Sequence, residues 1–155
     1  MSEPINILEH IAQINGWVFE RDNEEEATIA LKGRWSDYSL HFSWHGETRS
    51  LQLACHMEKL KLESDSRLFF TLNDMNQRVW MGHFEMDDEG GIIFRHTQYI
   101  GSIPSSSMQE ILAIVIEAAV NEANRFYPAL NFLEQEKEAS DEDLAIALLD
   151  VMGQA

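Results

Sequence analysis

Apolar side chains recur along this chain at two spacings, and the alternation between the two spacings predicts the order of its elements. A spacing of three or four residues, as at Ile5, Leu8 and Ile11, is typical of an amphipathic helix, and a spacing of two is typical of a strand with one buried face. The pattern predicts a helix, four strands, a second helix, two strands and a long third helix. In order, these elements are expected at residues 2–15, 17–20, 28–31, 40–45, 51–57, 68–79, 80–86, 92–99 and 107–127.

The third and fourth strands also predict how they pair. Leu40, Phe42 and Trp44 share one face of the third strand, and Leu51, Leu53, Cys55 and Met57 share one face of the fourth. If the two apolar faces coincide, Phe42 lies opposite Leu53 and Trp44 lies opposite Leu51. This register places His41 opposite Ala54 on the polar face.

Turn and cap residues predict where other elements begin and end. The polar, glycine-containing sequence at residues 87–91 is expected to reverse the chain between the last two strands. Ser64 or Ser66 is expected to cap the second helix, because a serine hydroxyl can accept a hydrogen bond from a free amide of the first turn. Pro128 is expected to end the third helix, because proline lacks an amide hydrogen.

The composition changes after residue 132 and divides the chain into three parts. Residues 1–132 are expected to form one α+β domain in which helices back a largely antiparallel sheet. Residues 133–143 are expected to form an acidic linker, and residues 144–152 a short amphipathic segment that carries Leu144 and Leu148. This segment is too short to be a stable helix alone, so we expect it to dock on its own domain, on a second subunit or on a partner.

The charge of the chain restricts its partners. With 27 acidic and 11 basic residues the formal net charge is −16, which disfavours nucleic acid and anionic membrane surfaces. The charge either keeps an apolar protein in solution or selects basic protein partners. The N-terminus has no signal-peptide pattern and the single Cys55 cannot form an internal disulfide, so we expect a cytoplasmic protein.

The residues that could carry chemistry do not form a recognisable catalytic or metal-binding pattern. His41 and His45 are four residues apart, which on a strand is about 13 Å and too far to hold one ion. No glycine-rich loop leads from a strand into a helix, as a phosphate site would require. We therefore expect no catalytic residue, no metal and no cofactor.

Eight residues are candidates for a surface that binds a protein partner or a second subunit. They are Trp35, Tyr38, Trp80, His83, Phe84, Arg95, Leu144 and Leu148. An alternative is a small-molecule or enzymatic pocket near Trp35, Tyr38, His83 and Arg95, which requires these four side chains to converge on one cavity. A third hypothesis is that the chain is a structural part of a larger complex, held through residues 144–152.

Several sequence blocks, taken in order, resemble the YbjN family of bacterial sensory transduction regulators. The blocks are GRWSDYSLHFSW (33–44), LACHM (53–57), NQRVWMGHF (76–84), GIIFRH (91–96) and RFYPALNF (125–132), and the resemblance covers about residues 4–132. It implies a fold similar to type III secretion chaperones, a homodimer, and a non-enzymatic role in binding a protein client or regulator. It implies no catalytic residue or cofactor.

Overall fold

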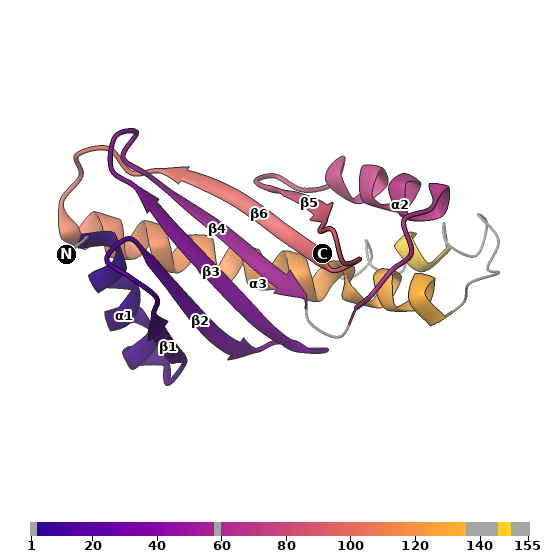
Figure 1. Cartoon of the computed structure of the whole chain (residues 1–155), viewed down its shortest axis with the longest axis horizontal. Helices are drawn as coiled ribbons and strands as arrows, with labels where there is room; N and C mark the ends of the chain where they lie inside the picture. The colour runs from indigo at the N-terminus through magenta and orange to yellow at the C-terminus, as the bar shows by residue number, and fades with distance from the viewer. Residues whose placement is uncertain (1–2, 58–59, 136–145, 150–155) are drawn as a thin grey trace.

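The computed structural model describes residues 3–57, 60–135 and 146–149. Within these residues, three helices and six strands follow the predicted order, and residues 146–149 form a further helical turn (Figure 1). The helices and strands are α1 (Glu3–Asn15), β1 (Val18–Arg21), β2 (Glu26–Lys32), β3 (Asp37–His45), β4 (Ser50–Met57), α2 (Ser66–Asn76), β5 (His83–Met86), β6 (Ile92–Tyr99) and α3 (Ser105–Gln135). The predicted α+β class is therefore confirmed.

The six strands form one antiparallel sheet in the order β1-β2-β3-β4-β6-β5. Phe42 lies opposite Leu53, Trp44 opposite Leu51 and His41 opposite Ala54, so the predicted register is confirmed. Strand β6 inserts between β4 and β5, which leaves β1 and β5 as the two edges of the sheet. This insertion joins elements that are distant in sequence, and the local pattern did not predict it.

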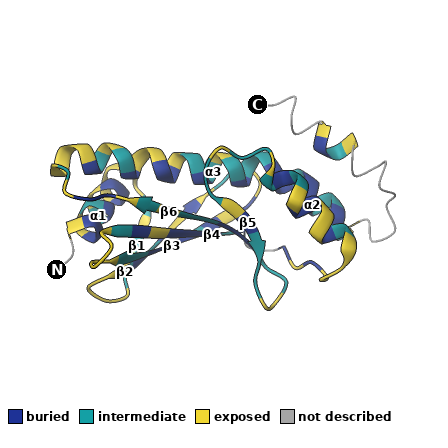
Figure 2. Ribbon diagram, turned by 90° about the horizontal axis from the view of Figure 1, so that it is seen from above, coloured by how far each residue is buried: buried dark blue, intermediate teal, exposed yellow. Residues whose placement is uncertain are grey.

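Helices α1 and α3 cover one face of the sheet and leave the other face open, as Figure 2 shows. Alternate strand residues, among them Leu40, Phe42, Leu53 and Phe94, point towards the helices and are buried. The residues between them are mostly polar and form the open face. The core therefore lies between the sheet and the two helices, and α2 packs separately against β5.

The third helix is longer than the sequence predicts, and the expected end at Pro128 is wrong. Helix α3 continues through Pro128 to Gln135, so the first three residues of the expected linker 133–143 are helical. Proline removes one backbone hydrogen bond and its ring crowds the carbonyl of Asn124, at a cost of about 3 kcal/mol. Burial of Ala129, Leu130 and Leu133 beyond the proline outweighs this cost.

Two local details around α2 also differ from the prediction. The helix is capped by Asp65, whose carboxylate accepts from the Leu68 amide at 3.0 Å, and not by Ser64 or Ser66. Aspartate is an equally good cap, and the sequence alone did not discriminate among these neighbours. The strand predicted from Trp80 begins only at His83, because Gly82 has a φ of +71° that breaks the extended backbone.

Candidate functional site

The four residues of the predicted small-molecule pocket lie on both faces of the sheet and in a loop beside it. The Tyr38 side chain points to the helices, and its hydroxyl donates to Oδ1 of Asn124 on α3 at 2.7 Å. His83 and Arg95 are paired across β5 and β6 on the open face, where both are partly accessible. Trp35 lies in the loop between β2 and β3, 47% exposed, with a guanidinium group over its ring. A pocket that requires all four side chains is therefore not formed.

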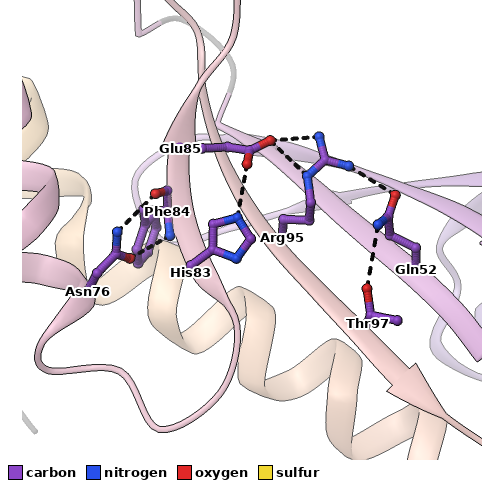
Figure 3. Close-up of polar contacts among 7 residues, drawn as sticks. All are labelled: Gln52, Asn76, His83, Phe84, Glu85, Arg95 and Thr97. Atoms are coloured by element: carbon purple, nitrogen blue, oxygen red, sulfur yellow. Dashed lines mark hydrogen bonds and ion pairs between the residues drawn. The ribbon is translucent and has the colours of Figure 1, made fainter.

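A polar cluster surrounds Arg95 on the open face (Figure 3). Its Nε donates to Oε1 of Glu85 at 2.7 Å and its Nη1 donates to the side-chain oxygen of Gln52 at 3.0 Å. The other oxygen of Glu85 is 2.9 Å from Nε2 of His83. Burial would raise the pKa of the Glu85 carboxyl, but hydrogen bonds from His83 and Arg95 outweigh it and hold the pKa below its ordinary value. The cluster is an internally neutralised network.

The remaining reactive side chain, Cys55, is fully buried in β4. Burial raises the pKa of its thiol to about 12, so it stays protonated and unreactive at neutral pH. Within the described residues, no group of three or more histidine, cysteine, aspartate or glutamate side chains is placed to hold a metal ion. No helix of the described part is long and apolar enough to cross a membrane.

Three exposed aromatic side chains lie on α2 and on the loop that follows it. Leu68, Thr71, Leu72 and Met75 form the buried stripe of this helix. Phe69 and Phe70 therefore face outward, 53% and 57% exposed, and Trp80 in the following loop is 99% exposed. We call these three residues the α2 aromatic surface. Large apolar side chains cost free energy when they face water, so a surface of this kind indicates an interaction site.

A groove runs beside Trp17, where β1 is shorter than its neighbour. The β1–β2 register ends at Val18 opposite Ala30, so the last residues of β2 extend beyond it. Two adjoining cavities of about 540 and 340 Å³ flank this point, and both are lined by Trp17, Leu31 and Lys32. The exposed Ile14 and Val18 stand nearby along the chain, 63% and 68% accessible. We call this feature the Trp17 groove.

The two edges of the sheet differ in whether a side chain bonds to their backbone. At β5, the Asn76 side chain of α2 donates to the Phe84 carbonyl at 3.0 Å and accepts from the Phe84 amide at 2.6 Å (Figure 3). This amide occupies the backbone positions that an added strand would use. No corresponding side-chain bond to the backbone of β1, beside the Trp17 groove, occurs among the described residues, although the Arg21 side chain of this strand donates to Asn6 and Glu9 of α1.

The predicted interface residues differ in whether their side chains are exposed or buried. Trp80 is fully at the surface, whereas Phe84 is 2% exposed and packs edge-on against Phe94 and Phe126, so its side chain is not part of the surface. Leu148 is buried, and Leu144 lies outside the described residues.

Sequence reasoning did not single out Phe69 and Phe70 as surface residues. The available signal was two consecutive phenylalanines beside the apolar stripe of a helix, because adjacent residues on a helix cannot both lie on one narrow face. Trp17 and Lys32 of the groove were also not singled out, because the groove exists only where β1 stops short of β2.

Comparison with known proteins finds one matching family and several solved structures with a similar fold. The family model "YbjN: Putative bacterial sensory transduction regulator" matches residues 4–132. No curated protein has significant similarity to the chain. Among solved structures, the chain aligns with "Crystal Structure of the ExsC-ExsE Complex" at 17% identity and a TM-score of 0.50, over 78% of this chain and 90% of that chain.

A second alignment is to the structure of the Yersinia pestis type III secretion chaperone SycH in complex with a stable fragment of YscM2. The identity is 17% and the TM-score 0.45, over 76% of this chain and 97% of that chain. The type III secretion chaperone-like α+β fold that the sequence blocks implied is confirmed.

Proposed function

This chain belongs to the YbjN family, and from that premise we propose that it is a non-enzymatic, cytoplasmic protein-binding module that acts as a homodimer. Its role is that of a sensory transduction regulator or of a chaperone-like protein for a client. The α2 aromatic surface carries this proposal, because Trp80 is 99% exposed and Phe69 and Phe70 are more than half exposed. Aromatic residues are enriched in protein interfaces, where they supply large buried area at a small entropy cost.

The α2 aromatic surface is the proposed contact between subunits. A two-fold dimer places the same surface of each copy against the other, so the same side chains are buried on both copies. At about 150–250 Å² per aromatic side chain, and with exposed fractions of 53%, 57% and 99%, the three residues would bury roughly 400 Å² on each copy, or about 800 Å² in the pair. A standard interface buries about 1,600 Å², so this surface supplies about half of one.

The Trp17 groove and the β1 edge are the proposed place for a client. An extended segment could pair with the open backbone at this edge and place alternate side chains in the groove. The opposite edge is unsuited to this, because the Asn76 amide already occupies the Phe84 backbone. The net charge of −16 favours a client segment with basic residues.

Two features support the non-enzymatic part of the proposal. Glu85 is held as a carboxylate between His83 and Arg95, which leaves it paired and not poised to exchange a proton near neutral pH. The Cys55 thiol is buried and its pKa is raised to about 12, so it is not a nucleophile.

The subunit contact is tested by measuring mass in solution. Light scattering after size-exclusion chromatography should give a dimer for the unchanged chain and a monomer for the double variant Phe69→Ser, Phe70→Ser. Asn73→Ser is the matched control, because Asn73 is exposed on the same helix and carries no apolar surface. A wild-type chain that is monomeric up to high micromolar concentration contradicts the proposed homodimer.

The client site is tested by photocrosslinking. A photoreactive amino acid at Val18, beside the Trp17 groove, should capture a discrete set of proteins in cells. The same group at Thr48, an exposed position in the β3–β4 turn, is the control. Equal labelling patterns from the two positions would argue against the groove as the client site.

A further inference from the structure

The C-terminal turn at residues 146–149 is apolar on two sides. It is helical, and Leu148 is only 4% exposed and belongs to the hydrophobic core. Ile146 and Leu149 point the other way and are 53% and 61% exposed. A surface helix normally presents polar residues to solvent, and a helix that is apolar all round is buried on all sides. Among the described residues, none fully covers the outer face of this turn.

The turn lies next to the proposed subunit contact. In both Figure 1 and Figure 2 it is beside α2 and the C-terminal end of α3. Helix α2 carries the exposed Phe69 and Phe70. The two outward-facing apolar pairs, one on each element, thus belong to the same end of the molecule.

We propose that the outer face of this turn, Ile146 and Leu149, is part of the homodimer interface and is covered by a second copy of this chain. The inference rests on the proposed homodimer and adds to it the C-terminal turn, which the family match at residues 4–132 does not include. Each protomer's turn is held by Leu148 on its own domain and packs its outer face against the other protomer.

Area supports a second copy as the occupant. The α2 aromatic surface alone buries about 800 Å² in a dimer, which is the upper range of non-specific crystal contacts. Burial of two more-than-half-exposed aliphatic side chains adds roughly 100 Å² on each copy. The total reaches about 1,000 Å², the lower limit for a specific interface. The turn therefore supplies the area by which the α2 aromatic surface falls short.

The charge of the turn is compatible with this arrangement. The four residues 146–149 carry no charge, although the ten residues 136–145 before them contain five acidic residues and one lysine. An uncharged face avoids the repulsion between identical acidic segments that a two-fold contact would otherwise bring together.

Sedimentation of the full chain tests the inference. The double variant Ile146→Asp, Leu149→Asp should raise the dimer dissociation constant at least tenfold, because it places charges in an apolar contact. Ile114→Asp is the matched control, since Ile114 is an equally exposed isoleucine, 55% accessible, on the N-terminal half of α3, and it should leave the constant unchanged. Both altered turn residues are at the surface, so the domain should keep its thermal unfolding temperature.

A chain truncated after Gln135 should show at least the same loss of dimer. If the double variant and the truncated chain both dimerise as the wild type does, while Phe69→Ser, Phe70→Ser is monomeric, the homodimer stands and the role of the turn is refuted. A wild-type chain that is always monomeric refutes both.

Discussion

The amide of Asn76 provides the sharpest quantitative prediction. Its side chain makes two hydrogen bonds to Phe84, to the carbonyl at 3.0 Å and from the amide at 2.6 Å, and it joins α2 to the edge strand β5. Replacement by alanine removes both bonds and leaves two backbone groups without these partners in a partly buried place. At about 0.5–1.5 kcal/mol for each bond, Asn76→Ala should lower the free energy of unfolding by roughly 1–3 kcal/mol.

The measurement is urea-induced unfolding followed by circular dichroism, with Asn73→Ala as the control. Both residues are asparagines on α2, and Asn73 is exposed; the gain in helix propensity is about 0.5 kcal/mol at Asn73 and smaller at Asn76, the last residue of the helix. The difference between the two variants reports mainly the two bonds. If the free energies of unfolding differ by less than about 0.5 kcal/mol, the amide does not stabilise the edge and the reasoning fails.

A second substitution at the same position adds a dependence on pH. In Asn76→Asp the ionised carboxylate can accept from the Phe84 amide but cannot donate to the Phe84 carbonyl, whereas the protonated acid can do both. The folded state therefore favours the protonated form and raises the pKa of the new carboxyl. The loss of stability should be largest near pH 7 and should shrink as the pH falls towards 4; an unchanged loss over this range would contradict this geometry.

Three further predictions concern the core. In urea unfolding, Tyr38→Phe should cost about 1 kcal/mol of stability, because it removes the hydrogen bond to Asn124. Burial raises the pKa of Tyr38 above its ordinary value, so the stability of the wild type should fall above about pH 10 more steeply than that of the variant. Cys55, whose pKa is raised to about 12, should react with a thiol reagent at pH 8 only after unfolding, as measured by absorbance. Gly82→Ala should lower the melting temperature more than Gly16→Ala. Both glycines have a positive φ, but a Cβ at Gly82 would lie 2.5 Å from the Phe94 ring, whereas a Cβ at Gly16 would meet nothing within 4 Å.

Local patterns predicted the elements wherever one physical requirement dominated. The alternation of Leu40, Phe42 and Trp44 against Leu51 and Leu53 predicted the register, because a slip of one residue would turn every apolar side chain to water. The end of α3 was predicted wrongly because two requirements opposed each other there. The local cost of Pro128 is visible in the sequence, but the burial of the residues after it depends on elements elsewhere in the chain.

The surfaces were predicted less well than the elements. Trp80 was singled out and is exposed, but Phe84 was singled out and is buried, since its place between Phe94 and Phe126 depends on the contact of β5 with β6 and α3. The sequence by itself determined the class, the order of elements, the central register and the acidic charge, because these follow from spacing and composition.

Tertiary structure alone decided three things: the insertion of β6 between β4 and β5, the Trp17 groove where β1 stops short, and the closing of the β5 edge by Asn76. Each of these depends on contacts between residues distant in the chain, and the periodicity of a single segment carries no information about its neighbours in space.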